Sequence, residues 1–105
     1  MSLLYVSKGD PLNLTCLSEG GYPEPTVDWY RRGAVPTKLS NCVSETHFDS
    51  AISIYNVSRA CIHMPTEDDD GITFYCKSSY INEPFLIELT EVIVQLMCKY
   101  NDNTC

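Results

Sequence analysis

The chain has 105 residues, of which 44% are hydrophobic, which suits one globular domain and argues against a disordered segment. Lys and Arg total 7 against 14 Asp and Glu, giving a formal net charge of −7. This acidic balance argues against a nucleic-acid partner, because phosphate-binding surfaces gather basic residues.

Alternation of apolar and polar residues predicts short β-strands along the whole chain. In chain order, the expected strands cover residues 3–6, 12–16, 26–30, a short stretch at 37–42, part of 51–64, 72–76 and 86–97. Segments rich in Gly and Pro lie between them, including a turn at 18–25 and a loop at 80–85. The pattern predicts an all-β domain.

The same alternation assigns side chains to the two faces of a strand. The residues expected to face inward in the strands at 26–30 and 72–76 are Val27, Trp29, Phe74 and Cys76. Those expected to face outward are Asp28, Tyr30, Tyr75 and Lys77. The alternation breaks within 51–64 and again near Glu91, so we expect a β-bulge in each of these strands.

Cys16, Trp29 and Cys76 each lie within one of these expected strands. A disulfide between the inner faces of two sheets, with an indole packed against it, forms the core of an immunoglobulin-like antiparallel β-sandwich. The interval from Trp29 to Cys76 is too short for the two extra strands of a variable-type domain. We therefore expect a C-type or intermediate sandwich of seven or eight strands over residues 1–97, with a cysteine-containing tail at 98–105.

Six cysteines and two N-glycosylation sequons favour an extracellular domain that is secreted or displayed on a cell. The sequons begin at Asn13 and Asn56. The chain shows neither a signal-peptide pattern nor an apolar run of bilayer length, so we expect an excised ectodomain.

The cysteines allow several pairings once the core bond is assumed. With Cys16–Cys76 as the core bond, the other expected bonds are Cys42–Cys61 and Cys98–Cys105, because each of these pairs is close in sequence. The alternative is an interchain bond through Cys98 or Cys105, which would make a homodimer.

The segment from Gly21 to Trp29 reads Gly-Tyr-Pro-x-x-x-Val-x-Trp. It resembles the segment between strands B and C of the C-type domains of T-cell costimulatory ligands and butyrophilins. The sequences at 55–58 and 74–76 are similar to strands E and F of the same families, and the resemblance covers roughly residues 10–80. Phe74 departs from many relatives, which place there the tyrosine of the tyrosine corner. The resemblance implies recognition of a protein on another cell, in immune regulation.

The extra cysteines resemble those of a second family, the T-cell costimulatory receptors. Cys42 and Cys61 are similar to a second disulfide that joins the C′ region to a later strand, and Cys98 is similar to a stalk cysteine that links two chains. That family generally lacks the Gly-Tyr-Pro…Trp motif, so the ligand-like interpretation leads and the receptor-like one is the alternative.

The residues able to perform chemistry are isolated in this sequence. The acidic run from Glu67 to Asp70 has consecutive rather than spaced carboxylates, which predicts a solvated turn instead of a calcium loop. His47 and His63 have no neighbour at a metal-ligand spacing. Because no nucleophile elbow or phosphate loop is present either, we expect no enzyme activity, metal, cofactor or small-molecule substrate.

In the families that the chain resembles, the outward face of strands G, F, C and C′ and the loop between F and G commonly dock partners. On this sequence, that face corresponds to Tyr30, Arg32, Tyr75, Lys77, Tyr80, Ile81, Pro84 and Phe85. Tyr and Arg are enriched in binding hot spots. Several of these side chains could equally serve only to pack along the strands.

Three functions fit these observations. The first is a cell-surface or secreted immunoregulatory protein that binds a protein receptor or ligand on another cell. The second is a costimulatory-receptor-like chain that dimerises through a tail cysteine. The third is a structural spacer or adhesion domain beside a variable-type domain that does the binding. A virus-encoded mimic of any of these proteins would have the same sequence features.

Overall fold

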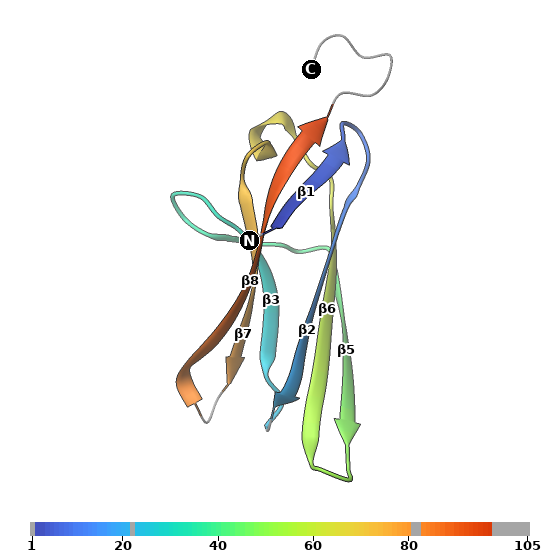
Figure 1. Cartoon of the computed structure of the whole chain (residues 1–105), viewed down its shortest axis with the longest axis vertical. Coiled ribbons are helices and arrows are strands. Elements are labelled where there is room, and N and C mark those ends of the chain that lie inside the picture. The colour runs from blue at the N-terminus through green and yellow to red at the C-terminus, as the bar shows by residue number, and fades with distance from the viewer. Residues whose placement is uncertain (1, 22, 81–82, 98–105) are drawn as a thin grey trace.

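The computed structural model describes residues 2–21, 23–80 and 83–97, with the backbone alone described for 20–21 and 83–88. The described chain is a sandwich of two sheets (Figure 1). Its strands are β1 (Ser2–Ser7), β2 (Leu12–Gly21), β3 (Thr26–Arg31), β4 (Thr37–Lys38), β5 (Cys42–Asp49), β6 (Ile54–His63), β7 (Thr73–Tyr80) and β8 (Glu83–Met97). A short 3-10 helix, η1 (Glu67–Asp69), lies between β6 and β7. No helix in this described part has the length and hydrophobicity needed to cross a membrane.

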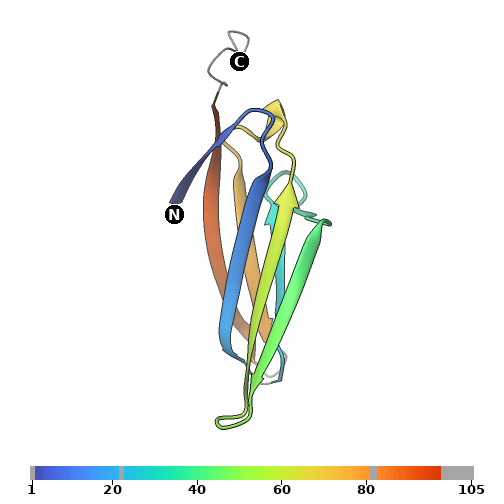
Figure 2. The same cartoon turned by 90° about the vertical axis from the view of Figure 1, so that its right-hand side faces the viewer.

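The strands divide into a five-stranded sheet, β1-β8-β7-β3-β4, and a three-stranded sheet, β2-β6-β5. Figure 2 looks onto the smaller sheet, with β8 and β7 behind it. Neighbouring strands are antiparallel except β1 and β8, which run parallel from Ser2↔Val92 to Ser7↔Met97. The predicted immunoglobulin-like β-sandwich is therefore confirmed.

The core lies between the sheets and is centred on Trp29. Cys16 of β2 and Cys76 of β7 form a disulfide across it, with their Cα atoms 6.3 Å apart. The indole Nε1 of Trp29 donates a hydrogen bond to the Arg59 carbonyl oxygen at 3.2 Å. Phe74 is fully buried, although it lacks the hydroxyl of a tyrosine corner. The predicted inward positions of β3 and β7 are all buried: Val27, Trp29, Phe74 and Cys76.

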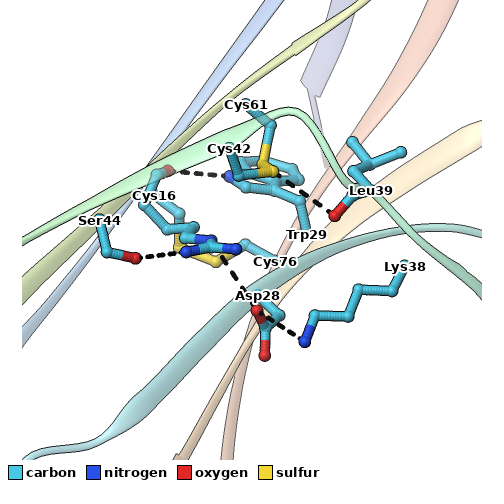
Figure 3. Close-up of polar contacts among 10 residues, drawn as sticks. Cys16, Asp28, Trp29, Lys38, Leu39, Cys42, Ser44, Cys61 and Cys76 are labelled. Carbon is cyan, nitrogen blue, oxygen red and sulfur yellow. Dashed lines mark hydrogen bonds and ion pairs between the residues drawn. A yellow bond between two sulfur atoms is a disulfide. The ribbon is translucent and has the colours of Figure 1, made fainter.

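A second disulfide joins Cys42 to Cys61, with their Cα atoms 4.0 Å apart (Figure 3). These residues are direct register partners on β5 and β6, so the bond lies within one sheet. It does not bridge from a C′ strand, as the resemblance to receptors implied. The tail cysteines, Cys98 and Cys105, lie outside the described residues.

The prediction of a single short strand at 37–42 is wrong. β4 ends at Lys38 in the larger sheet, the chain crosses over through the buried Leu39, and β5 begins at Cys42 in the smaller sheet. β5 was not expected because it is an edge strand whose residues are almost all exposed. Such a strand has no buried positions to impose an apolar alternation.

β2 is longer than expected. The sequence predicted a turn from Ser18 onward, yet Ser18 is buried and pairs with Val57 of β6. The register shifts between Ser18 and Gly21, and the strand still ends only at Gly21. Cross-strand pairing with β6 therefore overrides the local preference of the Gly-Gly pair for a turn.

The two expected bulges are absent from β6 and from the pairing of β8 near Glu91. β6 pairs with β5 without a shift, and β8 pairs with β7 without a shift from Thr73 to Ser79. No bulge is needed at these two places, because each strand carries apolar side chains outward: Ile62 is 51% exposed and Leu89 is 51% exposed. The register of β8 with β7 shifts elsewhere, between Ile87 and Glu83. The loop expected at 80–85 is also wrong, since Tyr80 already pairs with Glu83.

Candidate protein-recognition face

The outer face of the larger sheet is assembled by the register of β3, β7 and β8. Tyr30, Tyr75 and Glu91 are successive register partners across these three strands, and Asp28, Lys77 and Leu89 form the next row. Alternation turns the outer positions of β7 away from the core, because Phe74 and Cys76 face inward. We call the surface formed by Tyr30, Arg32, Tyr75, Lys77, Leu89 and Glu91 the recognition face.

Two tyrosines and an arginine at the centre of this face are held in place by their neighbours. The rings of Tyr30 and Tyr75 stack with centroids 5.3 Å apart and planes at 19°. The Arg32 guanidinium carbon lies 5.2 Å from the Tyr75 ring centroid, and its Nη2 lies 3.1 Å from Glu91 Oε2. Half of the Arg32 side chain remains exposed. The cluster is thus ordered and still accessible.

Asp28 differs from the prediction that it faces solvent. It is only 9% exposed, because Lys38 Nζ lies 3.4 Å from its Oδ1 (Figure 3). Arg59 Nε also lies 3.8 Å from this Oδ1. Arg59 belongs to the other sheet and also donates to Ser44 Oγ at 2.6 Å. Asp28 therefore helps to close the edge of the sandwich and offers little to a partner.

Tyr80 is not on the recognition face. Its hydroxyl lies 2.8 Å from Ser18 Oγ of β2, so the side chain is directed toward the opposite sheet. It shares its strand parity with the buried Phe74, Cys76 and Ser78. Of the other residues assigned to this face, Ile81 lies outside the described residues, as do the side chains of Pro84 and Phe85 in β8.

Leu89 and Glu91 are on the recognition face although sequence reasoning did not assign them to it. A bulge near Glu91 would bring the apolar residues of β8 onto one buried face and would change which side Leu89 and Glu91 face. The alternation of inward and outward side chains along β8 was the sequence signal that could have identified them. Read without a bulge, the alternation that buries Val94 turns Leu89 and Glu91 outward.

The turn between β6 and β7 was expected to be solvated, but Asp69 within it is only 2% exposed. Its carboxylate accepts hydrogen bonds from Arg31 Nε at 2.6 Å and from the Thr66 backbone N–H at 2.9 Å, and His63 Nε2 lies 3.0 Å away. Burial opposes ionisation of Asp69, yet these hydrogen bonds and His63 hold its pKa below the usual range. Asp69 is an internal anchor rather than a surface charge.

The described residues contain no group of three or more His, Cys, Asp or Glu side chains placed to hold a metal ion. His63 has Asp69 beside it, and His47 is exposed on β5. What the outer face of the larger sheet offers is a contact surface of stacked aromatic, cationic and apolar side chains.

Comparison with known families decides the type of sandwich. Residues 4–84 match the family model described as a CD80-like C2-set immunoglobulin domain. The chain belongs to this C2-set immunoglobulin family. C2-set domains are typical of cell-surface recognition and adhesion proteins, and they are typically non-enzymatic.

One curated relative of this C2-set domain is the CD166 antigen of Bos taurus, 28% identical over 68 residues that make up 62% of the chain and 12% of that protein. Among solved structures, Rst D1-D2 superposes with a TM-score of 0.78 at 13% identity, over 91% of this chain and 45% of that one. The full ectodomain (Ig1-Ig3) of mouse nectin-like molecule 4 superposes with a TM-score of 0.75 at 19% identity, over 90% of this chain and 31% of that one. These likenesses show the fold, and the chain spans less than half the length of each.

Proposed function

We propose that this C2-set domain is a non-catalytic recognition module of an extracellular, immunoregulatory protein resembling the costimulatory ligands, and that its recognition face binds a protein on another cell. The observation that carries the proposal is the cluster of Tyr30, Tyr75 and Arg32. Tyr and Arg are the residue types that dominate binding hot spots. Tyr30 and Tyr75 stand here on paired strands, Arg32 directly follows β3, and the exposed Leu89 lies in the next row.

The side chains of this cluster are already ordered before a partner is present, and this order favours binding. The ring stack and the Arg32–Glu91 ion pair already restrict four long side chains. Ordering a flexible side chain at an interface costs about 0.5–1.5 kcal/mol, so a pre-ordered cluster loses less on binding. An exposed apolar residue next to it adds area that a partner can remove from water.

The test is to stain panels of immune cells with fluorescent tetramers of the domain secreted from mammalian cells. We expect tetramers of the wild type to stain a subset of cells. Tyr75→Ala and Arg32→Ala should each weaken this staining by about 30-fold, the effect of losing a hot spot of roughly 2 kcal/mol. Glu45→Ala, an exposed change on the other sheet, is the matched control and should stain as the wild type does.

Equal staining by the Tyr75, Arg32 and control variants would show that binding does not use this face. A second candidate function is a spacer within a longer adhesion chain. This second function is favoured by the match to the CD166 antigen, because the domain covers only 12% of that protein. Tetramers of a correctly folded wild-type domain that stain no cell type would support this second function over the first.

A further inference from the structure

Both N-glycosylation sequons lie on the outer face of the three-stranded sheet. Asn13 on β2 is exposed and pairs with Ile62 of β6, whereas Asn56 on β6 is half-buried and pairs with His47 of β5. In each sequon the acceptor and its hydroxyl residue, Thr15 or Ser58, are two positions apart on a strand and so share a face. Both sequons therefore present their acceptor groups on this outer face.

The register places these asparagines at the two ends of an apolar strip. Four successive rows cross the sheet: Asn13–Ile62, Thr15–Ala60–Val43, Leu17–Ser58–Glu45 and Asn56–His47. Asn56 is six positions from Ile62 on β6, so the end rows are about 20 Å apart. Three exposed apolar side chains occupy the first three rows: Ile62 (51%), Val43 (68%) and Leu17 (55%). The exposed Ala60 lies between them, so these apolar groups form one patch, and such a patch marks a surface that another molecule contacts.

A shallow hollow of this surface has Asn56 in its lining, together with Leu17, Glu45, His47 and Ser58. A glycan on Asn56 would thus start beside Leu17, and a glycan on Asn13 would start beside Ile62. N-linked glycans are bulky and hydrophilic, and they occupy exposed surface. Two of them, starting from opposite ends of the strip, suit it better than a protein partner does, since a partner would have to fit between them.

We propose that Asn13 and Asn56 both carry N-linked glycans, that these glycans together cover the outer face of β2, β6 and β5, and that they leave the recognition face as the surface open to a protein partner. The proposal rests on the extracellular, partner-binding role proposed above. It adds a modification at two named sites and assigns opposite roles to the two sheets.

Occupancy is tested first on the chain secreted from mammalian cells. Enzymatic release of N-glycans from the wild type should lower its mass by two glycans, and Asn13→Gln and Asn56→Gln should each carry one. Retention of the wild-type mass by either variant would overturn the assignment of that site.

Covering is tested by hydroxyl-radical footprinting of the folded protein before and after enzymatic release. Because the glycans are removed after folding, a secretion defect of the Asn variants cannot obscure the result. Oxidation of Leu17 and Ile62 should rise by about threefold or more when the bulky glycans are lost. Leu89, on the opposite sheet, is the internal control and should not change. Equal oxidation of Leu17 and Ile62 in the two states would overturn the covering role.

The division of roles is tested with a glycan moved to the other sheet. Lys77→Asn completes a sequon with Ser79 on the recognition face, whereas Lys77→Asn with Ser79→Ala makes the same substitution without a sequon. In the tetramer assay, the first variant should stain cells at least about tenfold more weakly than the second, and removal of the native glycans should leave wild-type staining unchanged. Staining that depends instead on the native glycans would overturn the proposal.

The two proposals fail separately. If wild-type tetramers stain no cells, the recognition function fails, and the mass and footprinting measurements still decide whether the smaller sheet is glycosylated and covered. If tetramers stain cells through the recognition face and the asparagines are unmodified, the glycan assignment alone is wrong.

Discussion

Asp69 is the side chain at which three parts of the chain meet. Its carboxylate binds Arg31 from β3 and the Thr66 backbone at the start of η1, with His63 of β6 beside it. β3 and β6 belong to different sheets, so this one carboxylate ties both sheets to the turn between β6 and β7. If Asp69 lost its charge, the guanidinium of Arg31 would lose its ionic partner at a buried position.

We predict that Asp69→Asn lowers the free energy of unfolding by about 3 kcal/mol at pH 7, because it breaks a buried charge-assisted hydrogen bond and ion pair. The wild-type pKa of Asp69 is lowered by folding, so its contribution is complete above the pKa of an unfolded carboxyl, about 4, and is lost as pH falls below it. The difference in free energy of unfolding between wild type and variant should therefore narrow from pH 5 to pH 2. Urea unfolding at several pH values measures it.

The matched control for this prediction is Asp68→Asn, the same change at the exposed neighbouring position. It should alter stability by less than about 0.5 kcal/mol. A similar loss in both variants, or a gap that stays constant down to pH 2, would contradict the role given to Asp69.

Tyr80 contributes to packing between the sheets and not to the recognition face. Because its hydroxyl meets Ser18 between the sheets, Tyr80→Phe should cost about 1 kcal/mol of stability, the net value of one hydrogen bond. The same variant should leave tetramer staining of cells unchanged, in contrast to Tyr75→Ala. Urea unfolding and cell staining measure the two effects, and a staining loss without a stability loss would return Tyr80 to the recognition face.

β5 is the element held least by its surroundings. It lies at the edge of its sheet, pairs with β6 alone, and exposes every residue from Val43 to Phe48. The Cys42–Cys61 bond fastens the beginning of this strand to its neighbour. Because an edge strand with little buried apolar surface opens readily, that bond is what we expect to keep β5 in register.

We predict that Cys42→Ala with Cys61→Ala lowers stability by about 3 kcal/mol, as expected for a bond closing a loop of this length. Amide hydrogen exchange followed by mass spectrometry should quicken mainly in residues 42–49. Residues 73–80 of β7, in the centre of the other sheet, serve as the internal reference. Exchange that quickens equally in both segments would indicate that the bond supports the whole fold instead.

Strands with buried positions were predictable from the sequence, and strands without them were not. β3 and β7 carry Val27, Trp29, Phe74 and Cys76 inward, and their alternation located both strands and their faces. β5 has no such alternation and was missed. In β6 and β8, outward-facing Ile62 and Leu89 were mistaken for evidence of bulges. The rule that apolar residues face inward holds in only one direction, since folded surfaces also expose many apolar atoms.

The candidate site was predictable only in part for a related reason. Tyr30, Arg32, Tyr75 and Lys77 were assigned to the recognition face from the families that the chain resembles, and the structure gathers them on one outer surface. The inward direction of Tyr80 depends on where β7 ends and β8 begins, and that boundary depends on pairing between strands. The burial of Asp28 depends on Arg59, from the opposite sheet. Contacts of this kind are absent from local sequence patterns.

The molecule as a whole has two unlike outer surfaces on one core. The larger sheet presents stacked tyrosines, Arg32 and Leu89, and the smaller sheet presents the two sequons with an apolar strip between them. Trp29 and the Cys16–Cys76 bond hold these layers together, so we expect a substitution on one surface to leave the other undisturbed. This separation makes the paired tests on opposite sheets independent of one another.

The parallel pairing of β1 with β8 has a mechanical consequence. If tension acted between residues 2 and 97, it would pull the start of β1 and the end of β8 in opposite directions along the same axis. The ladder from Ser2↔Val92 to Ser7↔Met97 would then be loaded in shear, with all its hydrogen bonds sharing the force rather than opening one after another. Resistance to such pulling is governed by the unfolding rate. β8 also contributes to the recognition face, so a partner bound there would contact a strand of this load-bearing ladder.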